Sequence, residues 1–317
     1  MFKVRKIGII GTGHVGSHVA FAIATQGEAD EIFMADSNKE KAISQAMDLN
    51  DAVSYLPHHV QTYAVGVEDM GDCDIIVFAG GLIPDPDKTR LEMLADTMSV
   101  VNDVIPRIKE SGFTGIIISI SNPADVVCAA IQKKLAYPKS KIICTGTALD
   151  SSRLQRLLSD TLRVSRRSLQ AFSMGEHGGS AMVPWSFIKV GGKALAQLQT
   201  DNPNRYPMFD PSQMEQAMKD GGYIVLKGKG STEFGIATAT VELIRAIFHN
   251  ENKILPCSVL LEGEYGEHDV FASVPVMLGK GGIEDILEIP LTSDEKAAFH
   301  QSCEIMRQHI AKAMDLT

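Results

Sequence analysis

The chain has 317 residues, which is enough for one large core or two smaller domains. Hydrophobic residues make up 44% of it and charged residues 22%, the balance of an ordinary globular protein. The net charge of −9 argues against the basic surface that a nucleic-acid partner requires. No apolar run approaches the roughly 18–20 residues of a transmembrane helix, so we expect no membrane partner.

The cysteines and the first residues indicate the compartment. The five cysteines are odd in number and never spaced as CxxC, which predicts reduced thiols and no metal site. The basic start is followed by an apolar stretch that Gly8, Gly11 and Gly13 interrupt, too short for a signal-peptide core. We therefore expect a cytoplasmic protein.

In the first half of the chain, short apolar β-branched runs alternate with helical patterns. Runs that are apolar throughout predict strands buried on both faces, as in a parallel sheet. The predicted strands are 6–10, 31–35, 74–79, 115–120 and 141–145. The predicted helices are 15–25, 39–50, 91–110 and 125–135. This alternation predicts a doubly wound α/β sheet of the Rossmann type over residues 1–148.

The pattern changes after residue 148. The predicted elements there are helices at 151–162, 211–225 and 232–249, strands at 169–174, 182–190, 254–261 and 270–278, and a C-terminal helix from 293. This mixed order predicts a second, α+β domain over residues 149–317.

The segment 11–16, Gly-Thr-Gly-His-Val-Gly, fits the pattern GxGxxG. It directly follows a predicted strand and opens a predicted helix, the context that dinucleotide binding requires. Gly11 permits the tight turn, Gly13 lets a pyrophosphate approach the backbone, and Gly16 lets the helix pack on the strand. The helix N-terminus then offers free N–H groups to the phosphates.

Asp36 stands at the end of the next predicted strand, where an acidic ribose-binding residue belongs. A carboxylate there accepts hydrogen bonds from the ribose hydroxyls and repels a 2′-phosphate. Ser37 and Asn38 follow it, with no arginine. The segment therefore favours NAD over NADP, the alternative being a helix-capping role for Asp36.

Two stretches of the second half carry acid–base and anion-binding residue types. Asp150 and Arg153 lie one helical turn apart, and His177 lies within Gly-Glu-His-Gly. Taken singly, Asp150 could be a helix cap with Arg153 as its partner, and His177 a structural histidine. Together they offer an acid, a carboxylate that orients it, and a guanidinium for a substrate carboxylate.

With these residues, the chain resembles the L-lactate/L-malate dehydrogenase family over essentially its whole length. The matching segments are 11–16, Asp36, 89–91, 121–123, 149–153 and 175–178, in family order. The resemblance implies an NAD-binding domain over 1–148 and a catalytic, substrate-binding domain over 149–317. It also implies an NAD-dependent oxidoreductase that forms a homodimer or homotetramer.

The resemblance gives roles to the three residues of the second half. His177 would donate a proton when a 2-oxo acid is reduced and accept one when a 2-hydroxy acid is oxidised. Asp150 would fix the tautomer of the imidazole and favour its charged form. Arg153 would hold the substrate carboxylate as a bidentate fork.

Further roles follow from the same resemblance. Asn122 would place both the substrate and the nicotinamide, and Thr232 would line the pocket. The Gly-, Pro- and Asp-rich segment 80–89 predicts a loop, which in the family closes over the substrate and brings Arg90 to the reacting carbonyl.

One position separates this chain from the lactate and malate enzymes of the family. Where those typically carry glutamine or arginine, the matching loop residue is Ile83, and no arginine precedes Arg90 in the loop. Malate is therefore disfavoured, and an apolar side chain such as that of 2-oxoisocaproate is favoured, as in the L-2-hydroxyisocaproate dehydrogenases. Two alternatives stay open: an L-lactate dehydrogenase proper, with the loop alignment shifted by one residue, and a non-catalytic NAD-binding protein.

Overall fold

The computed structural model describes residues 3–81 and 90–315 of the chain. Its helices are α1 (His14–Gln26), α2 (Lys39–Val53), α3 (Arg90–Glu110), α4 (Ala124–Leu135), α5 (Ala148–Leu162), α6 (Leu195–Asp201), α7 (Pro211–Lys229), α8 (Phe234–Phe248) and α9 (Ser293–Met314). Its strands are β1 (Lys6–Ile10), β2 (Glu31–Ala35), β3 (Gln61–Ala64), β4 (Ile75–Phe78), β5 (Ile116–Ser119), β6 (Ile142–Cys144), β7 (Leu169–Gln170), β8 (Lys189–Val190), β9 (Lys193–Ala194), β10 (Lys253–Glu262), β11 (His268–Gly279) and β12 (Gly282–Ile286).

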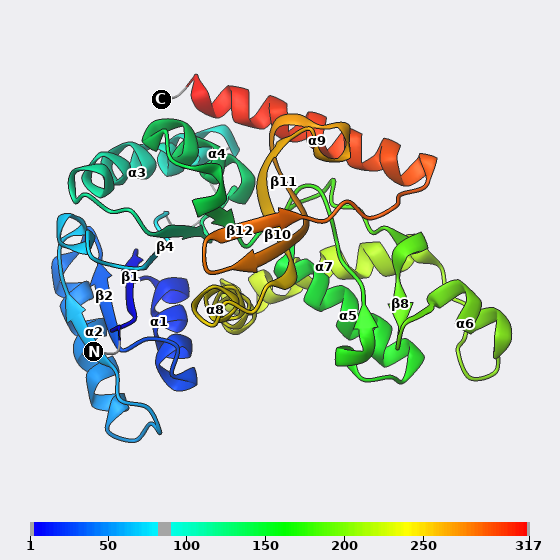
Figure 1. The fold of residues 1–317 in the computed structure, drawn as a ribbon, viewed down its shortest axis with the longest axis horizontal. Helices are drawn as coiled ribbons and strands as arrows, with labels where there is room; N and C mark the ends of the chain where they lie inside the picture. The colour runs from blue at the N-terminus through cyan, green and yellow to red at the C-terminus, as the bar shows by residue number, and fades with distance from the viewer. Residues whose placement is uncertain (1–2, 82–89, 316–317) are drawn as a thin grey trace.

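The first half forms the predicted parallel sheet, in the order β3-β2-β1-β4-β5-β6 (Figure 1). Every residue of β4, β5 and β6 is buried, as expected for strands covered on both faces. The helices α1 and α2 cover one face, and α3 and α4 cover the other. The strand order reverses between β1 and β4, so the loops after these strands flank the crevice in which doubly wound sheets bind ligands.

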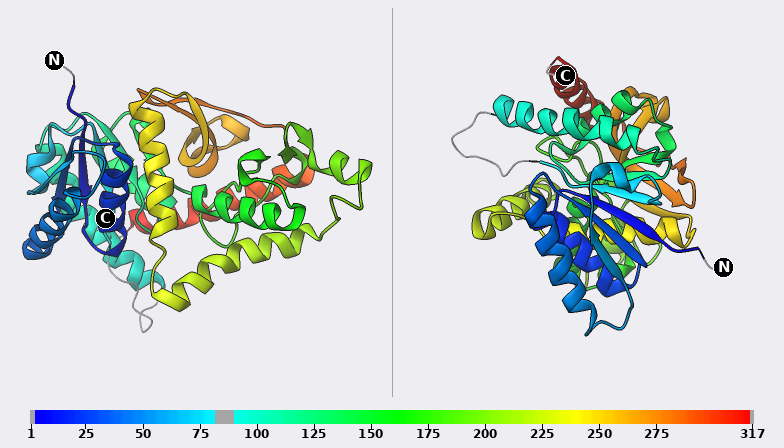
Figure 2. Two further views of the ribbon diagram at one scale, coloured as in Figure 1. Left: turned by 90° about the horizontal axis from the view of Figure 1, so that it is seen from below. Right: turned by 90° about the vertical axis from the view of Figure 1, so that its left-hand side faces the viewer.

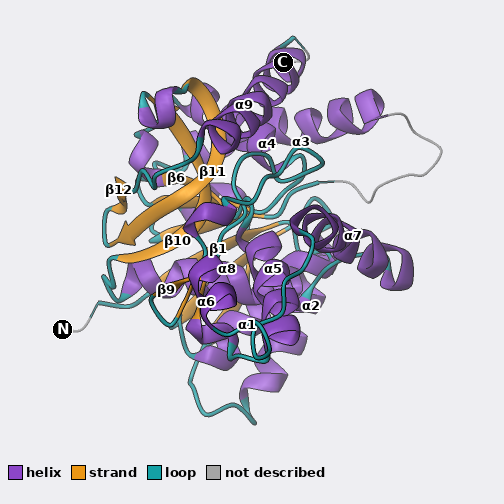
Figure 3. Cartoon of the chain, turned by 90° about the vertical axis from the view of Figure 1, so that its right-hand side faces the viewer, coloured by secondary structure: helices purple, strands orange, loops and turns teal. Residues whose placement is uncertain are grey.

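The second half adds antiparallel strands to the same sheet. Strand β10 pairs with β6 at Ser258 and Cys144, and β11 and β12 continue the sheet to nine strands (Figure 3). A separate small sheet has the order β7-β8-β9. The predicted Rossmann sheet followed by an α+β region is confirmed.

Two predicted strands are shorter than expected. The run 169–174 pairs only at β7 and in an isolated bridge between Met174 and Met182, and the run 182–190 pairs only in that bridge and at β8. Gly175 takes a φ of +85°, and Pro184 lacks the N–H that a strand would use, so neither run continues as a strand. The strands β3 and β12 were not predicted, because neither sequence is a continuous apolar run.

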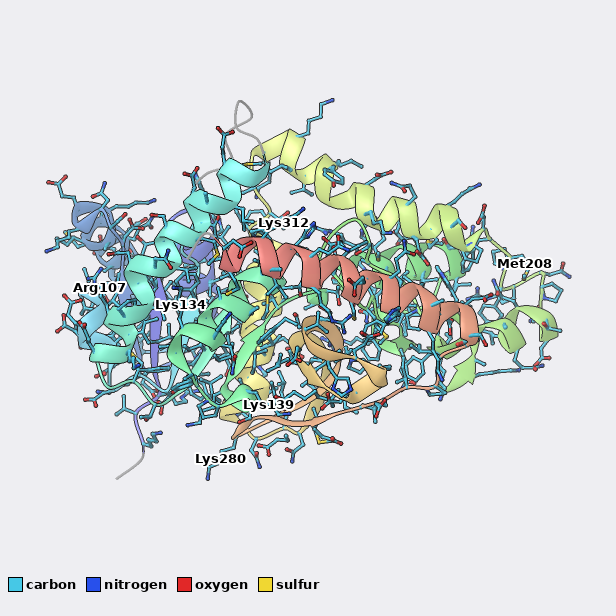
Figure 4. All side chains as sticks on the ribbon, turned by 90° about the horizontal axis from the view of Figure 1, so that it is seen from above. Arg107, Lys134, Lys139, Met208, Lys280 and Lys312 are labelled. Atoms are coloured by element: carbon cyan, nitrogen blue, oxygen red, sulfur yellow. The ribbon has the colours of Figure 1, made fainter. Side chains whose placement is uncertain are left out.

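One hydrophobic cluster is shared by the two halves, and a separate cluster lies entirely in the second half. A single cluster of buried residues extends from Ile7 on β1 to Met306 on α9, and α1 packs against α8 (Figures 1 and 2). Seen from above, α9 crosses the molecule, and Arg107 and Met208 lie toward opposite ends (Figure 4). All five cysteines are buried free thiols. Of the helices in the described ranges, none combines the length and apolar character needed to cross a membrane.

Candidate active site

The turn after β1 requires glycine at two positions. Gly11 has a φ of +90°, and a Cβ there would lie 2.5 Å from the carbonyl oxygen of Ala79. A Cβ on Gly16 would lie 1.9 Å from the carbonyl oxygen of Gly11, so the first turn of α1 packs directly on the loop. At Gly13 the nearest described atom to a Cβ is Lys41 Nζ, 3.7 Å away. The backbone of this turn is therefore open on the side that a pyrophosphate would approach.

The groups around this turn fit a dinucleotide. Helix α1 starts at His14 with no side-chain cap and no acidic residue in its first turn, which leaves its positive end to an anion. Asp36 Oδ2 accepts the N–H and the hydroxyl of Thr12 at 2.8 and 3.1 Å, and Oδ1 accepts the N–H of Asn38 at 3.0 Å. Burial raises the pKa of Asp36, but these hydrogen bonds and the nearby Lys41 charge leave it below its ordinary value. The carboxylate is thus ionised at neutral pH.

The buried carboxylate of Asp150 joins His177 and Arg153, the two residues predicted to act with it. Asp150 lies in the first turn of α5 and is 7% exposed. Its Oδ2 lies 2.6 Å from His177 Nδ1, and its Oδ1 accepts a hydrogen bond from Arg153 Nη1 at 2.6 Å. Within the described ranges His177 Nε2 has no hydrogen-bond partner, so this nitrogen is left to a ligand.

The charges around His177 keep its ring protonated. Burial lowers the pKa of His177, but the charge and hydrogen bond of Asp150, together with the charge of Asp125, raise it to about 9. Burial raises the pKa of Asp150, but His177 and Arg153 leave it below its ordinary value. At neutral pH the pair is therefore an imidazolium and a carboxylate. The His177 side chain remains 27% exposed, so its proton is accessible.

The loop that carries His177 is fixed at successive residues. Three main-chain N–H groups donate to three different elements. They are Gly175 to the Ser273 carbonyl of β11 at 2.9 Å, Glu176 to the Ser302 hydroxyl of α9 at 2.9 Å, and His177 to the Asp125 carboxylate of α4 at 3.0 Å. The position of the imidazole therefore depends on the sheet and on helices from both halves.

Two consecutive glycines of α7 lie against the Arg153 side chain. A Cβ on Gly222 would lie 3.2 Å from Arg153 Nη1, and a Cβ on Gly221 would lie 3.5 Å from Arg153 Cδ. Glycine costs about 1 kcal/mol relative to alanine inside a helix. The pair therefore leaves room for the Arg153 side chain at a cost to helix stability.

The predicted residues Asn122 and Thr232 lie on connections near these elements. Asn122 is exposed after β5, and its carbonyl accepts the Thr97 hydroxyl at 3.3 Å. The preceding Ser121 donates to the Gly80 carbonyl at 2.6 Å, which ties the loops after β4 and β5 together. Thr232 is half-buried between α7 and α8.

Two predicted residues are not placed by the structure. Ile83 lies outside the described residues. Helix α3 begins at Arg90, but the Arg90 side chain is also outside what the structure describes. The specificity loop therefore stays a prediction from the sequence.

The sequence analysis missed Asp125 and the glycine pair of α7. Both positions nevertheless stand out in the sequence. Asp125 is an acidic residue at the start of an otherwise apolar helical run, and Gly221-Gly222 interrupts a predicted helix. A charge or a glycine pair that weakens a predicted element often marks a functional position.

A dinucleotide turn combined with a histidine–aspartate pair is typical of nicotinamide-dependent oxidoreductases. Residues 5–144 match the family model of the lactate/malate dehydrogenase NAD-binding domain, and residues 147–317 match that of the lactate/malate dehydrogenase α/β C-terminal domain. The chain belongs to the lactate/malate dehydrogenase family. It is an NAD-dependent oxidoreductase that acts on hydroxy acids.

Curated relatives and solved structures agree with the family. L-lactate dehydrogenase 3 of Bacillus thuringiensis subsp. konkukian is 37% identical over 306 residues, covering 96% of this chain and 97% of the relative. L-lactate dehydrogenase of Fusobacterium nucleatum is 36% identical over 310 residues, covering 98% and 97%. The ligand-bound crystal structure of the minor L-lactate dehydrogenase of Enterococcus mundtii has a TM-score of 0.93 at 32% identity, covering 97% of this chain and 98% of that one.

Proposed function

We propose that the protein is an L-lactate dehydrogenase, which reduces pyruvate to L-lactate with NADH and catalyses the reverse reaction. The observation that carries the proposal is the buried Asp150, which holds His177 through one oxygen and Arg153 through the other. The names of the relatives favour lactate over the larger hydroxy acids that Ile83 suggested.

Each residue of the site has a role in this proposal. His177 donates its ring proton to the carbonyl oxygen during reduction and takes a hydroxyl proton during oxidation. Asp150 holds the ring by Nδ1 and stabilises its charge, so that the proton moves at Nε2. Arg153 binds the substrate carboxylate, and its guanidinium geometry suits a two-point contact.

The turn after β1 would hold the cofactor, with Gly11, Gly13 and Gly16 at the pyrophosphate and Asp36 at the adenosine ribose. Bound NADH supplies the hydride. From the family resemblance, Asn122 orients the substrate and the nicotinamide, Thr232 lines the pocket, and Arg90 polarises the carbonyl. The chain itself contributes orientation, charge and the proton.

The test is a panel of 2-oxo acids with NADH, followed by absorbance at 340 nm. We expect the highest kcat/KM with pyruvate, and little turnover of oxaloacetate because no second arginine precedes Arg90 in the loop. A clear preference for 2-oxoisocaproate would overturn the lactate assignment. No oxidation of NADH with any 2-oxo acid would overturn the reaction class.

A second candidate is a dehydrogenase of larger apolar 2-hydroxy acids, which the apolar Ile83 at the matching loop position favours. Because one methylene changes discrimination by only about 1–3 kcal/mol, the same panel would then show a broad rather than a sharp preference.

Three further parts of the proposal concern the whole chain. We place the domain boundary near residue 148, and the protein in the cytoplasm, where buried reduced cysteines are usual. We propose a homodimer or homotetramer, since Phe21 of α1 and Ile43 and Met47 of α2 are large apolar side chains 47–63% exposed. Light scattering coupled to size-exclusion chromatography tests the subunit count, and a monomer would contradict it.

A further inference from the structure

A second carboxyl group contacts the main chain of His177, the proposed acid. Asp125, in the first turn of α4, is 2% exposed, and its Oδ2 accepts the main-chain N–H of His177 at 3.0 Å. Its Oδ1 is buried with no hydrogen-bond partner in the part of the chain that the structure describes. The hydroxyl of Ser258 on β10 is likewise buried and unpartnered there, and it lies near enough to lower the pKa of Asp125.

The apolar packing of α4 does not require a carboxyl group here, since the next residues, Val126 and Val127, are buried and apolar. A buried carboxylate is costly, whereas an amide of the same shape would keep the bond to His177 without a buried charge. A buried carboxyl group at this cost indicates a role at the site.

The charges around His177 give Asp125 a specific effect. The titratable groups that face the ring or its carboxylate partners are Asp150 and Arg153 of α5, Cys144 at the end of β6, Glu176 of the same loop and Asp125 of α4. Burial raises the pKa of Asp125, while the hydrogen bond from the His177 N–H and the nearby His177 charge oppose that rise. In its ionised form, Asp125 opposes loss of the His177 proton.

We propose that Asp125 is a positioning residue for His177, which it serves by fixing the main chain and by retaining the proton on the ring. The catalytic consequence rests on the proposed function. The effect of Asp125 on the His177 ring does not rest on the proposed function, because that effect is present in the protein without substrate or cofactor. The two contributions are separable, since asparagine keeps the acceptor oxygen and removes the charge.

The first experiment titrates His177 by NMR in the free full-length protein, with its ring signal identified by its loss in His177→Asn. In Asp125→Asn we expect the His177 pKa to fall by on the order of one unit. Asp103→Asn, which replaces an exposed aspartate of α3, is the matched control and should leave the His177 pKa unchanged. An unchanged His177 pKa in Asp125→Asn would overturn the proposed charge effect.

The second experiment follows pyruvate reduction against pH. Asp125→Asn should keep the low-pH value of kcat within a few-fold and lose activity at a lower pH than the parent. Asp125→Ala should lower kcat by roughly 10–100-fold with a small change in KM, because the imidazole is no longer fixed. A folded Asp125→Ala protein with parental kcat would overturn the positioning role. If the parent reduces no 2-oxo acid, the proposed function fails while the NMR result still decides the effect on His177.

Discussion

At the scale of single residues, Asp150 couples the two ends of the proposed chemistry. Its oxygens hold the imidazole and the guanidinium at 2.6 Å each, so a proton donor and an anion binder share one buried counter-charge. These three residues could be identified from the sequence, because each belongs to a short motif, Leu-Asp-Ser-Ser-Arg or Gly-Glu-His-Gly, and the two motifs complement each other chemically. Asp125 was not identified, since its contact with His177 joins positions 52 residues apart.

Replacing His177 tests the acid directly. In His177→Asn we expect NADH to bind with nearly unchanged Kd, while kcat for pyruvate falls by about 10²–10⁴-fold, the usual contribution of general acid–base catalysis. Fluorescence titration with NADH and the 340 nm assay measure the two quantities. His300→Asn, an exposed histidine of α9, is the control and should keep full activity. Undiminished turnover in His177→Asn would remove this residue from the mechanism.

Replacing Asp36 tests the cofactor preference. Because its pKa is lowered, the Asp36 carboxylate is charged at and above neutral pH and repels the 2′-phosphate of NADPH. We expect Asp36→Ser to reduce kcat/KM with NADH about tenfold or more and to narrow the ratio of NADH to NADPH turnover. Glu40→Gln, in the first turn of α2, should leave that ratio alone. A parent enzyme that uses both cofactors equally would refute the role of Asp36.

At the scale of elements, burial and capping decide which predictions were accurate. Strands β1 and β2 have the predicted bounds, because continuous apolar runs between glycine and polar residues leave little choice of register. Helix α5 begins three residues earlier than predicted, at Ala148, so Asp150 lies inside its first turn rather than at its cap. Helix α7 runs through Gly221 and Gly222, which the sequence alone would allow to end it. Tertiary packing on α5 overrides the weak helix propensity there.

The glycine pair gives a prediction with a control in the same helix. In Gly222→Ala, the new Cβ would lie 3.2 Å from Arg153 Nη1, so the guanidinium must shift. Because Arg153 binds the carboxylate that all 2-oxo acids share, we expect kcat/KM for pyruvate to fall about tenfold. Gly228→Ala also lies in α7, but no described atom would contact its Cβ within 4 Å. Gly228→Ala should raise helix stability and leave kcat/KM for pyruvate unchanged. Equal kcat/KM values in both variants would exclude a role of Gly222 in placing Arg153.

At the scale of the whole molecule, a hydrophobic cluster and an ion-pair network join the two halves. Glu28, which follows the C-cap of α1, is 4% exposed. It accepts hydrogen bonds from Arg245 Nε of α8 at 2.6 Å and from His249 Nε2, directly after α8, at 3.0 Å. The order of the predicted strands and helices indicated the two halves. It could not indicate the pairing of Glu28 with Arg245, which joins residues more than 200 positions apart.

This pairing predicts how the protein unfolds. Removing one partner of a buried ion pair costs about 3–5 kcal/mol. The Arg245 side chain is 31% exposed, so water can hydrate it once Glu28 is replaced. We therefore expect Glu28→Gln to lower the free energy of unfolding by about 1–3 kcal/mol. Urea midpoints measure the change. Glu304→Gln, whose partner Arg307 binds it at 3.2 Å on the surface of α9, should cost less than about 1 kcal/mol.

The same titrations test whether the halves unfold together. The only tryptophan, Trp185, reports on the second half by fluorescence, whereas circular dichroism reports on the helices of both. Because a hydrophobic cluster spans the two halves, the two signals should follow a single transition in the parent protein. Glu28→Gln weakens only the contact between α1 and α8, so separate transitions in that variant alone would identify this contact as the one that couples the halves. Separate transitions already in the parent would contradict the single cooperative body.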